Sequence, residues 1–140
     1  MFRGCYIHSV DDKSRICLPA RLRQSVSEPM MLTKGPEGCL WLLRGGQWQV
    51  LLNKASSSAS IQRFFVAPAC ECSPGQRGRI ALPVSLRLHS NIKPGEEIAI
   101  VGLGNRIEVW SLARWDAASS QITHERIREE LPEFFQENHL

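Results

Sequence analysis

The order of hydrophobic and polar residues is typical of short strands joined by turns. Residues 5–10 alternate like a strand, and the polar residues 11–14 follow them as a predicted turn. A short strand over residues 15–18 leads to Pro19. Proline suits the start of a helix because its missing N–H group costs nothing there. The pattern therefore predicts a short basic helix over residues 20–26.

A hairpin and a longer helix are predicted next. Strands over residues 30–33 and 39–43 flank a turn over residues 35–38, and a helix follows near residues 48–54. The Ser-rich segment after it is a predicted loop or helix cap, with a helical turn over residues 61–65. The second half repeats the plan, with strands near 69–72 and 79–82, a turn over 75–78, a helix from Pro83, a hairpin over 98–102 and 107–110, and a helix from Leu112.

An internal repeat organises these elements. Residues 11–23, DDKSRICLPARLR, align with residues 75–87, GQRGRIALPVSLR, at an offset of 64, and six of 13 positions are identical. The match resumes at an offset of 67, where Trp48 meets Trp115. Each half alone is too small to bury a stable core. Two halves that pair about a pseudo-two-fold axis would close a small barrel, so the repeat predicts one intertwined domain.

Composition places the chain among folded soluble proteins. Its 140 residues are 43% hydrophobic and 22% charged, and no apolar run is long enough for a signal peptide or a membrane span. We therefore expect a cytoplasmic protein.

The net charge of +3 is unevenly distributed. Residues 1–115 carry 15 Lys and Arg against 8 Asp and Glu, a net charge of +7, whereas residues 116–140 have a net charge of −4. A basic body with an acidic tail is compatible with a polyanionic partner. The tail is predicted to be helical and interrupted at Pro132, and it would lie on its own body, on a neighbouring chain or over the anion-binding surface.

The sequence contains no pattern typical of a metal site, a cofactor site or a catalytic site. Five cysteines are expected to be reduced and to pack as small hydrophobic residues, since Cys70 and Cys72 lack the partners of a zinc set. The four histidines have no matched nucleophile, and the glycines of residues 102–104 open a hairpin, so we expect no enzyme. The four tryptophans are expected in the core or in interfaces.

Three segments together resemble the MraZ family of bacterial regulators over about residues 1–118. They are the start MFRGCYIHSVDDKSR, the doubled pattern R-I-x-L-P-x-x-L-R and the hairpin VGLGNRIEVWSLARW. The resemblance implies a mixed β/α, mainly β fold, an AbrB-type swapped-hairpin (double-split) barrel formed by two repeated halves, plus a C-terminal helix. The implied division is a SpoVT-AbrB unit over 5–50, a connecting segment over 51–68, a second unit over 69–115 and an acidic tail over 116–140.

The same resemblance implies a sequence-specific, DNA-binding transcription regulator associated with the nucleoid. Its partners would be double-stranded DNA, in direct repeats upstream of the division and cell-wall gene cluster and at its own promoter, and further copies of itself in a homo-oligomeric ring. No membrane partner is implied. Two alternatives remain: an AbrB-type antitoxin that acts through its acidic tail, and a ring scaffold with weakened DNA binding.

The family motif D-x-x-x-R maps onto both halves, with one change in each. The first half has Asp11 and Arg15, with Ser14 where the family has glycine, and the second half keeps Gly78 and Arg79 but has Gly75 at the acidic position. A positive φ at Ser14 would cost about 1 kcal/mol. A carboxylate missing at residue 75 gives up a hydrogen bond worth about 1 kcal/mol. We therefore expect Arg15 to be held more firmly than Arg79.

Arginine suits DNA recognition because its planar fork donates two parallel hydrogen bonds to guanine O6 and N7, or clamps a phosphate. Lysine and arginine elsewhere in the loops suit phosphate contacts, which position the protein without reading sequence. Arg23 and Arg87 would alternatively hold the fold through an ion pair or a helix terminus. The predicted DNA-binding residues are Arg15, Arg79, Lys13, Arg77, Asp11 as loop support, Arg21, Arg23 and Arg87.

Overall fold

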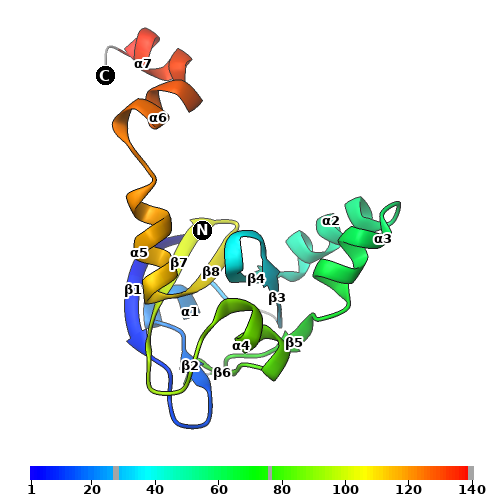
Figure 1. Cartoon of the computed structure of the whole chain (residues 1–140). Coiled ribbons are helices and arrows are strands. Elements are labelled where there is room, and N and C mark those ends of the chain that lie inside the picture. The colour runs from blue at the N-terminus through cyan, green and yellow to red at the C-terminus, as the bar shows by residue number, and fades with distance from the viewer. Residues whose placement is uncertain (27–28, 76, 139–140) are drawn as a thin grey trace.

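The computed structural model describes residues 1–26, 29–75 and 77–138, and both halves follow one order of elements (Figure 1). The first half comprises β1 (Phe2–Ser9), β2 (Arg15–Cys17), α1 (Ala20–Arg23), β3 (Met30–Gly35), η1 (Pro36–Gly38), β4 (Cys39–Arg44) and α2 (Gly45–Ala55). The second comprises β5 (Cys70–Cys72), β6 (Arg79–Ala81), α4 (Val84–Ser90), β7 (Glu97–Gly104), β8 (Arg106–Ser111) and α5 (Leu112–Ser120). Between the halves lie α3 (Ala59–Ile61) and the π-helical η2 (Gln62–Val66). The predicted order is confirmed, with ends shifted by a few residues.

The halves exchange their first strands in one antiparallel sheet, whose order is β1-β7-β8-β4-β3-β5. Strand β1 of the first half pairs with β7 of the second, from Phe2 opposite Gly104 to Ser9 opposite Glu97. Strand β5 of the second half pairs with β3 of the first, and β4 pairs with β8 in the middle. The fold is thus mixed α/β, and strands of both halves are interleaved in one large antiparallel sheet. The closed swapped-hairpin barrel stays a prediction.

Strands β2 and β6 form a separate two-stranded ribbon, and both lie at the lower end of the molecule in Figure 1. Ile16 lies opposite Ile80, and both side chains are buried. Successive side chains of a strand point to opposite faces. The neighbours Arg15, Cys17 and Arg79 therefore lie on the outer face of the ribbon, where Cys17 and Arg79 are exposed and Arg15 is half-buried.

The repeated apolar residues lie in the core. Leu18 and Leu22 of the first half, and Leu82 and Leu86 of the second, are all at most 4% exposed. Each pair flanks a proline that precedes a short helix, α1 or α4. Helix α1 is shorter than predicted and ends at Arg23. The identities of the repeat therefore record the hydrophobic core that both halves share.

The predicted helical tail is divided into separate helices. After α5 come α6 (His124–Glu130) and α7 (Pro132–Asn138), and Thr123 caps α6 by accepting the N–H group of Arg126 at 3.1 Å. Helices α6 and α7 extend from the sheet at the end opposite to β2 and β6 (Figure 1). Residues 139–140 of the predicted tail lie outside the described residues. No helix in the described part of the chain is long and apolar enough to cross a membrane.

The cysteine prediction is correct for three of the five residues. Cys39 is buried, and Cys70 and Cys72 pack against the main core. The prediction is wrong for Cys5 and Cys17, which are exposed although they lie in strands. Both occupy outward positions, so their hydrophobic character does not lead to burial.

Candidate functional site

The loop between β1 and β2 fixes Arg15 through Asp11. The Oδ1 atom of Asp11 accepts the backbone N–H groups of Lys13 at 2.9 Å and of Arg15 at 2.8 Å. Its Oδ2 atom accepts the side-chain Nε–H of Arg15 at 2.7 Å. The backbone closes the same loop, since the Ser14 N–H donates to the Asp11 carbonyl at 3.1 Å. Asp11 therefore orders both the turn and the guanidinium group that follows it.

These contacts keep Asp11 ionised. The backbone N–H of Arg15 is the largest cause that lowers the pKa of Asp11 below its ordinary value. Desolvation opposes this effect, and the Arg15 side chain and the Lys13 N–H add to it. Because hydrogen bonds to a carboxylate favour its charged form, Asp11 is ionised at neutral pH and keeps its contacts with Arg15.

The second loop has the matching turn without the carboxylate. Gly78 has a φ of +69° and donates its N–H to the Gly75 carbonyl at 3.3 Å, as Ser14 does to Asp11. Ser14 itself has a φ of +59°, so this motif position has a positive φ in both halves. Gly75 also has a positive φ, +65°. The second loop therefore differs from the first in its backbone as well as in its missing side chain.

The two loops are bound across the pseudo-two-fold axis. The Leu82 N–H donates to the Ser14 carbonyl at 3.0 Å, and the Leu18 N–H donates to the Gly78 carbonyl at 2.8 Å. In the ribbon, Arg15 lies opposite Ala81, and Arg79 is two residues before Ala81 on the same strand. Such diagonal positions are about 7–8 Å apart. The fold thus brings the two motif arginines together on one outer face.

The other predicted site residues have different environments. Lys13 and Arg77 are exposed in the two loops, and Arg21 is exposed on α1. Arg23 packs against Gly78, where a side chain would meet its Cδ atom, and Arg87 donates its Nε–H to the Leu82 carbonyl at 3.0 Å. Arg23 and Arg87 therefore have roles within the fold, and their contact with DNA stays a prediction.

Comparison with known proteins identifies the family. A family model described as "MraZ protein, putative antitoxin-like" matches residues 1–64 and again residues 65–137. The chain belongs to the MraZ family. It is 36% identical to "Transcriptional regulator MraZ" of Heliobacterium modesticaldum, over 96% of this chain and 99% of that protein. It is 34% identical to the protein of that name from Alkaliphilus oremlandii and 35% identical to that from Caldicellulosiruptor saccharolyticus, each over 95% of this chain and 98% of the relative.

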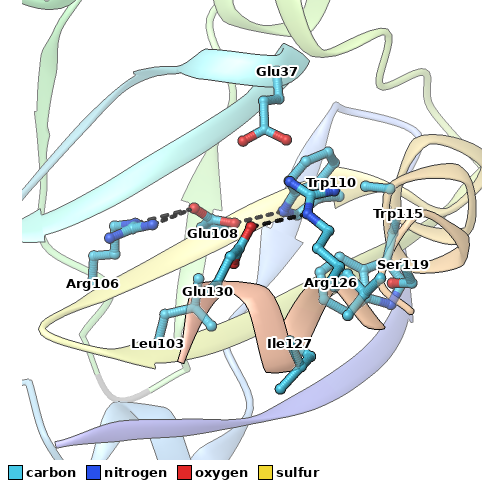
Figure 2. A pocket seen from close by; sticks show the side chains of 12 residues that line it. Glu37, Leu103, Arg106, Glu108, Trp110, Trp115, Ser119, Arg126, Ile127 and Glu130 are labelled. Atoms are coloured by element: carbon cyan, nitrogen blue, oxygen red, sulfur yellow. Dashed lines mark hydrogen bonds and ion pairs between the residues drawn. The ribbon is translucent and has the colours of Figure 1, made fainter. Parts of the chain in front are cut away.

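A second polar centre of this MraZ-family chain lies in the middle of the six-stranded sheet, where β4 pairs with β8. The carboxylate of Glu108 is 7% exposed and accepts the indole N–H groups of Trp41 at 3.0 Å and of Trp110 at 2.9 Å. It also pairs with Arg106 at 3.0 Å. Figure 2 shows Glu108 with Arg106 and Trp110 in the wall of a cavity of about 340 Å³, between β8 and the C-terminal helices. With three donor side chains on one carboxylate, the network links β4 to β8 and has a structural role.

Two thiols of this MraZ-family chain, the buried Cys39 and the half-buried Cys72, have raised pKa values. Burial, with Glu108 and Glu37 nearby, raises the pKa of Cys39 to about 12. Burial, with Cys70 and Glu71 nearby, raises the pKa of Cys72 to about 12. Only a thiolate attacks or binds metal readily. Within the described residues, no group of His, Cys, Asp and Glu side chains suits a metal ion.

Two features of these sites were not predicted from the sequence. Cys17 lies directly opposite Arg79 on the outer face of the ribbon, a position that strand alternation from Ile16 would have revealed. The Glu108 network depends on the register that places Trp41 opposite Glu108. These residues are 67 positions apart, and the sequence contains no motif that indicates their pairing.

Proposed function

We propose that this chain is a sequence-specific regulator of transcription that binds double-stranded DNA through the outer face of the β2–β6 ribbon. The observation that carries the proposal is the placement of Arg15 and Arg79 at diagonal positions of that face, each beside an exposed loop cation. The printed names of the relatives, "Transcriptional regulator MraZ", support the same class of function.

Arg15 is the principal base-reading residue in this proposal. Its contact with Asp11 uses Nε, and its two terminal nitrogens form no hydrogen bond with other described residues, so both can donate to DNA. A guanidinium group held in one orientation loses less conformational entropy when it binds guanine O6 and N7. Arg79 has no carboxylate partner among the described residues, so its side chain loses more conformational entropy when it makes the same contact.

The loop cations position the DNA. Lys13 and Arg77 flank the arginines and contact backbone phosphates, with Arg21, Arg23 and Arg87 extending the positive surface on α1 and α4. Asp11 supports the first loop. Because only Arg15 of the two motif arginines has a carboxylate partner among the described residues, we propose that the first half provides most of the base specificity. The second half then makes a larger share of the phosphate contacts.

One ribbon makes few contacts, so we propose that several copies act together. A homo-oligomeric ring that meets direct repeats about one helical turn apart raises the effective concentration of each ribbon. The proposed operator lies upstream of the division and cell-wall gene cluster and includes the chain's own promoter, which makes the protein cytoplasmic and nucleoid-associated. Each protomer consists of two AbrB-type units, residues 5–50 and 69–115, joined by residues 51–68 and followed by the acidic tail.

A binding experiment tests the proposal. Anisotropy of a labelled duplex from the upstream region is measured against salt for the wild type, Arg15→Ala, Lys13→Ala and Lys54→Ala, an exposed control on α2. Arg15→Ala is expected to weaken specific binding by about 10- to 100-fold, in line with 1–3 kcal/mol for a bidentate contact. Lys13→Ala is expected to lower the salt slope by about 1. Unchanged affinity in Arg15→Ala would remove the base-reading role.

An antitoxin is the second candidate function. The printed description of the family model includes the words "antitoxin-like", and the acidic α6 and α7 extend away from the ribbon (Figure 1). Deletion of residues 121–140 separates the candidates. A regulator retains DNA binding after the deletion, whereas an antitoxin loses its protein partner. A wild-type ring that binds no DNA at low salt would instead support the scaffold alternative.

A further inference from the structure

A basic pocket lies between β1 and α1, apart from the outer face of the ribbon. Its volume is about 400 Å³, and its described lining includes Arg3, Tyr6, Arg21 and Gln24. All four have side chains that donate hydrogen bonds. No carboxylate occurs among the lining residues that the structure describes. Two guanidinium groups around one hollow, without a counter-charge in its described wall, favour an anion in that place.

Gly4 shapes the wall of this pocket. Its φ is +103°, and a Cβ atom at this position would lie 2.9 Å from both Cε2 and Oη of Tyr6. Only glycine therefore allows the Tyr6 ring to lie against the strand backbone here. The ring is half-buried and packs against the main core, which fixes the position of its hydroxyl group. The pocket thus has one rigid donor in addition to its mobile arginines.

The cations of this pocket are not repeated in the second half. Arg21 corresponds to Ser85 at the offset of 64, and β5 spans only three residues against the eight of β1. The leucines of the core are repeated in both halves, whereas the side chains of Arg3 and Arg21 make no hydrogen bond or ion pair with other described residues. The cations of this pocket occur in one half only, so the fold does not account for them.

We propose that this pocket binds a phosphate-type anion, held by the guanidinium groups of Arg3 and Arg21 and by the hydroxyl group of Tyr6. The anion is either a backbone phosphate of the bound DNA or a free phosphate compound. If the anion is a backbone phosphate of DNA, the proposal rests on the proposed function. If it is a free phosphate compound, the proposal does not depend on that function.

Two arms of one experiment test the pocket and its source. Three proteins are compared: the full wild-type chain, the pocket variant Arg3→Ala/Arg21→Ala and the control variant Lys54→Ala/Arg63→Ala. The control removes the same charge from exposed positions on α2 and η2. Each protein is titrated with pyrophosphate by calorimetry and with the operator duplex at several salt concentrations. If the anion is a DNA phosphate, the pocket variant lowers the salt slope by about 1–2 and the control does not. If it is a free compound, pyrophosphate binds saturably and the pocket variant weakens that binding at least tenfold.

Tyr6→Phe keeps the ring against Gly4 and removes only the hydroxyl group. It is expected to weaken the same binding about tenfold, the effect of one hydrogen bond to a charged group. Equal behaviour of the pocket variant and the control in both arms would overturn the proposal. Loss of all DNA binding in the wild type would instead count against the proposed function, and the pyrophosphate arm would still decide whether the pocket binds an anion.

Discussion

Ile16 and Ile80 face each other directly across the β2–β6 ribbon, and their side chains are 1% and 2% exposed. This pair lies at the pseudo-two-fold axis and anchors the ribbon to the core. Since strand side chains alternate, the same pair directs Arg15 and Arg79 outward. Truncation of either isoleucine therefore affects the stability of the fold and the position of the proposed DNA-binding face together.

The first prediction concerns this anchor. Ile16→Ala and Ile80→Ala should each lower the free energy of unfolding by about 2–5 kcal/mol, because each leaves a cavity in a packed core. Urea unfolding at fixed protein concentration measures the change. Val84→Ala, at a side chain that is 59% exposed, is the control and should shift stability by at most about 0.5 kcal/mol. A small effect at Ile16 would show that the ribbon is not anchored there.

The second prediction concerns the two matched turns. Ser14→Gly should stabilise the chain by about 1 kcal/mol, since Ser14 adopts a φ of +59° that glycine reaches without strain. Gly78→Ser should destabilise it, because a Cβ atom there would meet Arg23 and would lie 2.9 Å from the Leu18 carbonyl. Thermal and urea unfolding measure both changes. A destabilising Ser14→Gly would contradict the proposed strain.

The third prediction is the titration of Asp11. Its pKa in the folded chain is lowered, so its contribution to stability is present above the unfolded pKa of about 3.9 and is lost as the pH falls through the folded value. The first loop should therefore stay intact between about pH 5 and pH 8. Carboxyl carbon NMR measures the pKa directly. Arg15→Ala should raise it only in part, because the backbone N–H groups remain. An Asp11 that titrates at its ordinary value would contradict the clamp.

The fourth prediction uses Cys17 as a reporter of the ribbon. Its exposed thiol lies opposite Arg79, so operator DNA should protect it from alkylation at pH 8. Cys39 and Cys72 should react slowly with or without DNA, since a pKa of about 12 leaves almost no thiolate. Exposed Cys5 on β1, outside the ribbon, is the internal reference, and DNA should lower its rate less than that of Cys17. Equal rates at Cys17 in both conditions would place the DNA elsewhere.

Much of the fold could be predicted because its information is local and repeated. The alternation in β1, the proline before each short helix and the glycines of the turns all occur in the sequence pattern, and the repeat indicated that the halves intertwine. The pattern does not show which strands pair, so the exchange of β1 and β5 was found only in the structure. The tail was predicted as a helix interrupted at Pro132, where α7 begins, but the break before α6, which Thr123 caps, was not predicted.

The candidate site could be predicted in part for the same reason. The motif located Arg15, Arg79 and the positive φ beside them. It does not distinguish an exposed arginine from one held by the fold: Arg23 contacts Gly78 of the other half, and Arg87 donates to the Leu82 carbonyl five residues before it. The contact of Arg23 depends on the pairing of the two halves in the ribbon, which the pattern of a single sequence does not reveal.

The most direct test of the central claim is a double-mutant cycle that combines a change at Arg15 with a change at guanine N7. Affinities of the wild type and Arg15→Ala are measured for the operator duplex and for the same duplex with 7-deazaguanine at the contacted position. The account predicts that 7-deazaguanine weakens wild-type binding about tenfold and leaves Arg15→Ala binding nearly unchanged, because the hydrogen bond is already lost. An equal loss for both proteins at every guanine of the operator would contradict base reading by Arg15.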